Sequence, residues 1–257
     1  MCLLVFALHT HPRLPLIVAG NRDEFHERPT QTARWWADNR NILGGRDLQA
    51  GGTWLAVHRN GRFAAVTNHR DAHRESAGLR SRGGLVTGFL DGDAGALEYL
   101  DSIDREAYAG FNLLVADSRS AAYLSNRGAG MRELPPGIYG LSNATLDEPW
   151  TKVTRSKSKL AGLIGEDNVN ETSLLRMLAD REKASAGEVR TNGLSFAMAH
   201  ALTAPFIVHP EYGTRCSTVV TISDTGNARF VERSFDPDGR TSGEARFDFE
   251  SGNEHAR

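Results

Sequence analysis

The sequence predicts an α+β fold built from antiparallel sheets, and three features of its apolar pattern support this. The apolar runs are short and end at turn residues. They come in pairs, with Asn60-Gly61 as the clearest turn between two of them. The helical patterns lie between pairs of strands, whereas a parallel sheet would alternate single strands with helices. Two such sheets with helices on their outer faces would form a four-layer α/β/β/α sandwich.

The N-terminal part is expected to form two hairpins. Pro12 marks the turn of the first hairpin, and Gly20 is expected to end its second strand. Asn-Gly between alternating apolar runs is the strongest short-range hairpin signal, and it marks the turn of the second. The predicted strands lie at 2–8, 14–19, 53–58 and 62–67.

The remaining elements are further hairpins and helices. Pro149 and the acidic residues before it are typical of a helix start near residue 147. Helical patterns cover 85–90, 94–103, 147–163 and 173–181. Strand patterns cover 111–116, 121–125, 138–142, 215–222 and 229–234.

Composition narrows the class of protein. The chain has 257 residues, of which 40% are hydrophobic, enough for the core of one large domain or two small ones. The formal net charge of −2 predicts no nucleic-acid partner. No apolar run is long enough for a membrane span, and the N-terminal run is too short for a signal peptide. Two cysteines cannot build a disulfide framework. We therefore expect a cytoplasmic protein that binds a small molecule.

The nine histidines do not indicate a metal site. None has the His-Glu-x-x-His spacing of a zinc helix, and no Cys-x-x-Cys-His haem attachment is present. We therefore expect no metal. Non-covalent haem ligation by a single Cys or His needs no particular spacing, so it stays open.

Cys2 is the residue that most directly suggests chemistry. Met aminopeptidases remove an initiator Met that precedes a small side chain, and Cys is small enough. Removal would leave a thiol and a free α-amine on one residue, and an amine with a pKa of about 8 is partly neutral at physiological pH and can act as a base. This is the logic of N-terminal-nucleophile catalysis. The alternative is that Cys2 is a small buried hydrophobic residue.

Four polar residues, Asn21-Arg22-Asp23-Glu24, follow the second predicted strand. The hairpin would bring them beside Cys2. There Arg22 could hold a substrate carboxylate or lower the thiol pKa, and Asp23 could accept a hydrogen bond from the α-amine. The alternative is a solvated loop with local salt bridges.

Three further polar residues lie at predicted strand ends. Asn143 could donate a hydrogen bond to a developing oxyanion, or it could be an ordinary turn residue. Asn68 has the same two interpretations. Arg215 could be a second guanidinium at the site or a surface charge, and Cys216 would face the other side of the same strand.

Taken in order, these motifs resemble the NRDE family, which is the transport and Golgi organisation protein 2 family. The resemblance rests on Met1-Cys2, Asn21-Arg22-Asp23-Glu24, Gly52-Thr53-Trp54, Thr67-Asn68-His69-Arg70, Ser81-Arg82-Gly83, Gly140-Leu141-Ser142-Asn143, Pro149-Trp150 and Lys152. It extends to about residue 235. We therefore expect a single domain over 1–235 and a polar, frayed tail over 236–257.

The resemblance implies an N-terminal-nucleophile hydrolase-like fold, more distantly similar to the penicillin V acylase and bile salt hydrolase group. By position, the counterparts of that group's catalytic residues are Cys2, Arg22, Asp23, Asn143 and Arg215. The expected pocket residues are Asn21, Glu24, Asn68 and Trp54. In that group the arginine and aspartate are separated, whereas Arg22 and Asp23 are adjacent, and adjacent side chains of a strand diverge.

We therefore expect a cysteine amidohydrolase that acts on a small non-peptide amide and needs no cofactor. Cys2 would attack the carbonyl, Asn143 and a backbone N–H would stabilise the oxyanion, Arg22 would tune the thiolate and Asp23 would orient the amine. Relatives in the family have been linked to haem trafficking and to lipid or acyl-CoA metabolism. The alternative is thus a non-catalytic haem or acyl-lipid carrier, with Cys2 or a histidine as the axial haem ligand, and a third option is an inactive scaffold. The oligomeric state is not indicated.

Overall fold

The computed structural model describes residues 2–70, 78–128, 130–191 and 193–252. Within these ranges the chain forms two antiparallel sheets. One has the strands β1 (Cys2–Leu8), β2 (Leu16–Phe25), β10 (Gly137–Leu141), β11 (Tyr212–Ile222), β12 (Asn227–Phe235) and β13 (Thr241–Glu250). The other has β3 (Thr30–Trp35), β4 (Ile42–Asp47), β5 (Leu55–His58), β6 (Phe63–Asn68), β7 (Phe111–Ala116), β8 (Ala121–Ser125) and β9 (Met131–Glu133).

The order of the strands places the N-terminal hairpin inside its sheet. The six-stranded sheet runs β10-β1-β2-β11-β12-β13, and the seven-stranded sheet runs from β3 to β9 in chain order. Strand β2 therefore pairs with β1 on one side and with β11, almost two hundred residues later in the chain, on the other. Sequence neighbours and distant segments thus meet along β2.

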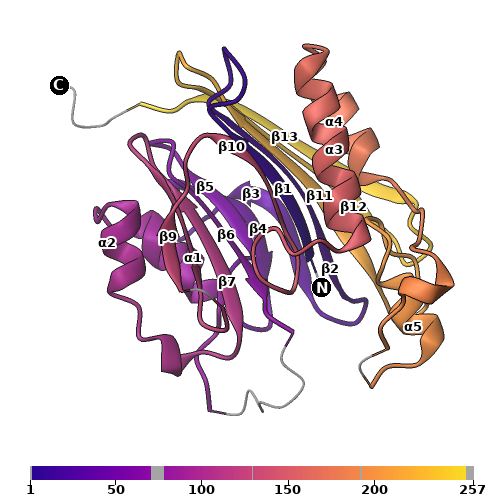
Figure 1. Cartoon of the computed structure of the whole chain (residues 1–257). Coiled ribbons are helices and arrows are strands. Elements are labelled where there is room, and N and C mark those ends of the chain that lie inside the picture. The colour runs from indigo at the N-terminus through magenta and orange to yellow at the C-terminus, as the bar shows by residue number, and fades with distance from the viewer. Residues whose placement is uncertain (1, 71–77, 129, 192, 253–257) are drawn as a thin grey trace.

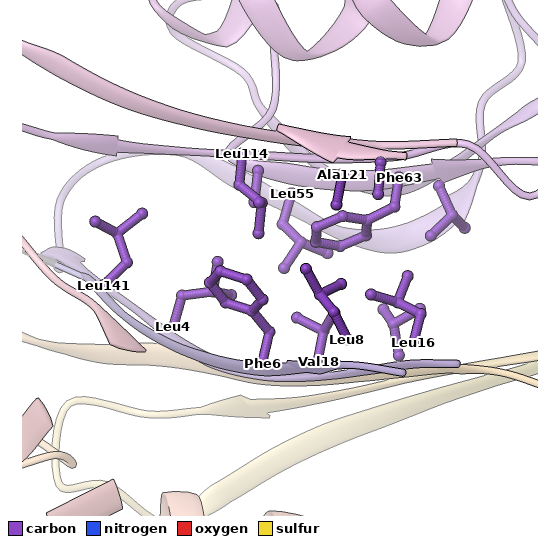
Figure 2. Close-up of a cluster of buried hydrophobic side chains, with 14 of the residues drawn as sticks. Leu4, Phe6, Leu8, Leu16, Val18, Leu55, Phe63, Leu114, Ala121 and Leu141 are labelled. Carbon is purple, nitrogen blue, oxygen red and sulfur yellow. The ribbon is translucent and has the colours of Figure 1, made fainter. Parts of the chain in front are cut away.

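The two sheets face each other across a shared apolar core. Alternate side chains of β1 and β2, such as Leu4, Phe6 and Val18, point toward Leu55 and Phe63 of the opposite sheet (Figure 2). Alternation with a period of two is what a strand buried between two layers requires. This layer is the central core of the sandwich.

Helices cover both outer faces, so the predicted four-layer α/β/β/α architecture is confirmed (Figure 1). Helices α1 (Gly83–Asp91) and α2 (Ala96–Asp101) pack on the seven-stranded sheet, and α3 (Thr151–Gly165) and α4 (Glu171–Leu178) pack on the six-stranded sheet. A short helix, α5 (Phe196–Ala201), lies near the end of β2 where the N-terminus is drawn. None of the described helices is long and apolar enough to cross a membrane.

The prediction that Gly20 ends the second strand is wrong. Strand β2 continues through Asn21-Arg22-Asp23-Glu24 to Phe25, so these four residues belong to the sheet and not to a loop. A Cβ at Gly20 would lie 2.8 Å from a methyl carbon of Leu4 and 2.9 Å from the ring of Trp54. Glycine is present here because the side chains of both sheets approach the backbone closely, and not because the chain turns.

The expectation of a frayed tail after residue 235 is also wrong as far as residue 250. Strand β13 pairs with β12 along the edge of the six-stranded sheet, and its alternate residues Phe247 and Phe249 pack against the central core. The exposed face of this edge strand is polar, which is why composition suggested a tail. Residues 253–257 lie outside the described ranges. Strands β3, β4 and β9 and helix α5 were not predicted.

Candidate active site

The site lies at the start of β1. Cys2 pairs with Arg22 on β2, and Arg22 pairs with Cys216 on β11. Directly paired residues point to the same face of a sheet, so these three side chains share the inner face. All three line a cavity of about 570 Å³, called here the thiol cavity. The register of three strands therefore places a thiol and a guanidinium in one hollow.

Arg22 is buried and already partnered by carboxylates. Its Nη2 lies 3.7 Å from a carboxylate oxygen of Glu24 and 3.8 Å from one of Asp47, and its Nη1 donates to the hydroxyl of Thr30. Burial raises the pKa of the Cys2 thiol, and the smaller opposing effect of Arg22 does not reverse this. The thiol is thus protonated at rest, and its attack on a substrate needs a base.

Asn143 holds the main chain of Cys2 in place. Its Oδ1 accepts a hydrogen bond from the Cys2 nitrogen at 3.1 Å, and its Nδ2 donates to the Asn68 carbonyl at 2.8 Å. The Ser142 hydroxyl donates to the Cys2 carbonyl at 2.7 Å. An amide nitrogen carries two N–H groups, so the Nδ2 of Asn143 keeps one more donor besides the one bonded to Asn68. The antiparallel pairing of β10 with β1 brings this amide, 141 residues away in sequence, to Cys2.

Asp23 faces the opposite side of β2, toward the helices. It is 2% exposed, and its Oδ1 accepts a hydrogen bond from the Thr214 hydroxyl at 2.7 Å. Burial raises the pKa of Asp23 from 3.8 to about 6, while the positive charge of Lys152 acts in the opposite direction. As expected for neighbours in a strand, the side chains of Arg22 and Asp23 point to opposite faces of β2, and both residues line the thiol cavity.

Lys152 is the most unusual residue near Asp23. It lies in the first turn of α3 and is 1% exposed, and its Nζ has no hydrogen-bond partner among the described residues. Burial lowers its pKa, and the charges of Asp23 and Cys2 act against that effect. A buried ammonium without a hydrogen-bond partner is costly. Such a group is a candidate for function and not a stabilising contact.

Two predicted residues lie away from the thiol cavity. The Asn21 side chain is on the helix side of β2, where its Nδ2 donates to the carbonyls of Leu178 and Pro205 at 2.9 and 2.8 Å. Arg215 is the extra residue of an irregularity between β11 and β2, and its Nη1 donates to carbonyls between residues 25 and 28, at 2.8 Å for Phe25. Asn21 therefore ties β2 to the helical layer, and Arg215 holds the chain that follows β2.

The other predicted pocket residues, Glu24, Asn68 and Trp54, line the thiol cavity. A second cavity of about 360 Å³, called here the outer cavity, adjoins it. Glu24, Phe25, Asn68 and Arg82 line both. Asn143 lines the outer cavity, so the amide next to Cys2 faces this second space.

The structure adds residues that the sequence reasoning did not assign to the site. Glu232 is a buried carboxyl that lines the thiol cavity, and its Oε1 accepts a hydrogen bond from the Ala33 N–H at 2.7 Å. Cys216 lines it too, and burial raises its pKa. A signal was present for Glu232, because it shares the phase of Phe230 in an alternating strand, where an apolar residue is expected. Arg82 and Lys152 belong to the motifs that indicate the family, but nothing in the sequence assigned either residue to the site.

No histidine is among the residues that line the thiol cavity. Within the described ranges no group of three or more His, Cys, Asp or Glu side chains gathers around a common point. Among the described residues, the thiols of Cys2 and Cys216 line this cavity and could ligate haem there, and His73 lies outside the described ranges. The haem alternative stays a prediction.

The two facing antiparallel sheets between helical layers, with a cysteine at the start of the first strand, define the N-terminal-nucleophile hydrolase-like fold. Solved structures are similar to this chain. A Caenorhabditis elegans N-acylethanolamine-hydrolyzing acid amidase ortholog matches with a TM-score of 0.52 at 13% identity, over 85% of this chain and 92% of that one. The C2A mutant of the conjugated bile acid hydrolase from Clostridium perfringens matches with a TM-score of 0.53 at 8% identity, over 100% of both chains. At these identities the likeness shows the fold alone.

Sequence relatives identify the family. The family described as Transport and Golgi organisation 2 matches residues 1–237. Transport and Golgi organization protein 2 homologs are 35% identical to this chain in Homo sapiens and 34% in Bos taurus, each over 91% of this chain and 93% of the relative. The Drosophila melanogaster protein is 27% identical over 93% of this chain and 95% of the relative. The chain belongs to the transport and Golgi organisation 2 family, as its motifs predicted.

Proposed function

We propose that this protein is a cysteine N-terminal-nucleophile amidohydrolase that acts on a small non-peptide amide. One observation carries the proposal. Cys2 lines the thiol cavity, and its main-chain nitrogen lies 3.1 Å from the Oδ1 of the buried Asn143. After removal of Met1 this nitrogen is the α-amine, held by an acceptor next to the thiol it must deprotonate.

The chemistry follows from these positions. The α-amine takes the proton of the Cys2 thiol while sulfur forms a bond to the amide carbon. The second N–H of Asn143 Nδ2 donates to the resulting oxyanion. The C–N bond then breaks and the leaving amine takes the proton from the α-ammonium. Water hydrolyses the thioester with the same amine as base, which releases a carboxylic acid and restores the thiol.

Asp23 and Lys152 would set the protonation state of the α-amine from the helix side of the sheet. An ionised Asp23 orients the amine by accepting its hydrogen bond. The positive charge of Lys152 lowers the pKa of Asp23, so it favours the ionised carboxylate. The same charge disfavours protonation of the α-amine, since like charges repel in a buried site. Only the second effect favours a neutral amine, which is the form that acts as a base, because an ionised Asp23 beside the amine favours its protonated form.

The comparisons support the proposal at the level of the fold. An amide-hydrolysing acid amidase and a conjugated bile acid hydrolase share the architecture of this chain. A shared architecture does not by itself fix a reaction, so the proposal rests on the surroundings of Cys2.

The test has two parts. Intact mass of protein purified from cells is expected to show loss of Met1. Amine release from a panel of N-acyl amides is then expected in the wild type and lost, by at least about a thousandfold, in Cys2→Ala. Cys216→Ser is the matched control, since Cys216 lines the same cavity and has no assigned step. Retention of Met1 in cell-derived protein, or equal turnover by wild type and Cys2→Ala, would sink the proposal.

A further inference from the structure

The six-stranded sheet ends in a long open edge. Strand β13 pairs with β12 on one side, and no strand of the described chain pairs with its other side. It has ten residues, and none of them is proline. The family match ends at residue 237, so β13 lies beyond the residues by which the family is recognised. An unpaired strand edge presents backbone N–H and C=O groups to which another strand can bond.

The other edges of the two described sheets are poor templates for pairing. Strand β9 has three residues, and β10 has five and directly follows Pro135-Pro136. Strand β3 directly follows Pro29 and shifts register against β4 between Gln31 and Arg34. Short strands, prolines and bulges are devices by which proteins protect sheet edges. Strand β13 shifts register against β12 only near its start and is regular from Gly243 onward, so it lacks this protection over most of its length.

The outer face of β13 carries charges of both signs. Its inner-face residues, such as Phe247, alternate with the outer-face residues Glu244, Arg246, Asp248 and Glu250. Side chains directly opposite each other in an antiparallel pair share a face of the sheet. A second copy of β13 could therefore pair only in registers that keep outer face beside outer face, because a slip of one residue exchanges the faces. These registers place the two-fold axis at a residue and not between two residues.

One of these registers matches the charges. With the axis at Ala245, Glu244 lies opposite the partner's Arg246, and this pair occurs twice. With the axis at Arg246, or at either acidic residue two positions from it, like charges would meet at the axis. With the axis at Phe247, Glu244 would lie opposite the partner's Glu250. Opposite charges directly across a strand pair stabilise it and like charges destabilise it, so charge complementarity selects Ala245 as the centre.

The same register fits the inner face of the sheet. Gly243 would lie opposite the partner's Phe247. A Cβ at Gly243 would meet no atom within 4 Å, so the space over this glycine is open. Phe247 is half-buried and packs at the border of the central core. An aromatic ring across from an edge glycine covers the backbone there, so each Phe247 would extend the central core toward the second copy.

We infer that this protein forms a two-fold dimer in which β13 pairs antiparallel with β13 of a second copy, centred on Ala245. The pairing joins the two six-stranded sheets into one continuous sheet, and it gives the exposed backbone groups of both edges a partner. No residue of β13 is among those that line the thiol cavity, so the inference does not depend on the proposed function.

Sedimentation velocity over a range of protein concentrations at low ionic strength tests the inference. The wild type is expected to form a dimer that dissociates on dilution. Glu244→Arg and Arg246→Glu should each weaken the dimer at least about tenfold, because each places like charges opposite each other twice. A mixture of the two variants should form a heterodimer, since position 244 of each copy then faces the opposite charge at position 246 of the other. Only the register centred on Ala245 gives this rescue.

Arg132→Glu is the matched control, because it makes the same charge reversal on the edge strand β9 and should leave the dimer unchanged. Thermal melting checks that the variants fold, since Glu244 and Arg246 also form ion pairs within the chain. For a variant that does not fold, wild type at high salt replaces it and should show a weaker dimer. A wild type that stays monomeric at about 100 μM, a dimer that survives both reversals, or a mixture that stays monomeric overturns the inference.

Discussion

The two ends of the inter-sheet layer differ in what surrounds their cavities. The cavity at the end of β1 distant from Cys2 is the larger, at about 730 Å³, and Leu8, Leu16 and turn residues line it. None of the ionisable side chains that line it is buried. The thiol cavity is about 570 Å³, yet Arg22, Asp23 and Glu232 are buried around it, and Lys152 is buried on the adjacent helix.

This difference in buried charge, and not cavity size, is the reason for placing the candidate site at the Cys2 end. Burial of ionisable groups costs free energy, and a chain selected only for stability would place apolar residues there. The distant cavity could arise simply because turns close the sheets imperfectly. The cost at the Cys2 end requires a reason, and catalysis or ligand binding supplies one. Four substitutions test the contrast.

Asp23→Asn is expected to give the largest effect. Folding raises the pKa of Asp23 from 3.8 to about 6, so the folded chain binds more protons than the unfolded chain between these values, and stability falls as the pH rises through them. Above about pH 6 the full penalty applies, and it is about 3 kcal/mol at 1.36 kcal/mol per unit. Asparagine removes the penalty and keeps an acceptor for Thr214.

Thermal melting at about pH 7.5 and at about pH 4 checks this prediction. The variant should melt at a higher temperature than the wild type at the higher pH and at a similar temperature at the lower pH. Activity should fall, because the amine loses its anionic partner. An equal rise in melting temperature at both pH values would mean that packing, and not the ionisation of Asp23, explains the change.

Asn143→Ala is expected to slow turnover about a hundredfold, because one oxyanion donor is worth about 3 kcal/mol. The effect should fall mainly on kcat. Steady-state kinetics on an amide hydrolysed by the wild type would measure it. Asn126→Ala removes an amide that bonds to the carbonyls of Arg105 and Tyr108, and it should leave kcat unchanged in the folded protein. Similar losses in the two variants would remove the special role of Asn143.

Leu8→Ala should reduce stability by about 2 kcal/mol and leave kcat unchanged. The Leu8 side chain is buried in the central core but borders the distant cavity. The expected loss of stability therefore lies at the low end of the range for Leu→Ala substitutions in a core. Denaturant unfolding measures the loss, and turnover below the melting temperature measures the activity. A large fall in kcat would show that the two ends are coupled and that the contrast between them is incomplete.

Lys152→Met is expected to have the smallest effect. In the wild type, turnover should fall as the pH drops through the Asp23 pKa of about 6, where the carboxylate becomes protonated. Loss of the neighbouring positive charge raises that pKa, so this fall in turnover should move upward by about one pH unit. Lys157→Met, on the same helix but paired with Asp147 at 2.6 Å, is the control. A fall in turnover that stays at the same pH would show that Lys152 does not act on Asp23.

Local patterns were enough to predict much of the fold. The hairpins β5–β6, β7–β8 and β11–β12 followed from alternation and turn residues, because strand periodicity and turn chemistry act over a few residues. Strands β3 and β13 were not predicted. Both lie at sheet edges, where one polar face hides the alternation that marks a buried strand.

The candidate site was predictable only in part. Cys2, Arg22, Asp23 and Asn143 were predicted because each lies at a strand end or in a motif, and the strand register brings them to one end of the sheet. Arg215 was also predicted, but an irregularity in β11 directs its guanidinium to the carbonyls of residues 25–28.

By itself the sequence determined the hairpins, the antiparallel class, the family and the cysteine at the start of the first strand. The tertiary structure alone decided that β2 continues through Asp23, that Lys152 and Glu232 are buried, and that Arg70 and Arg82 share a cavity. The physical reason is distance along the chain. Periodicity reports which face of its own element a residue occupies, whereas burial and charge pairing depend on which remote element packs against that face.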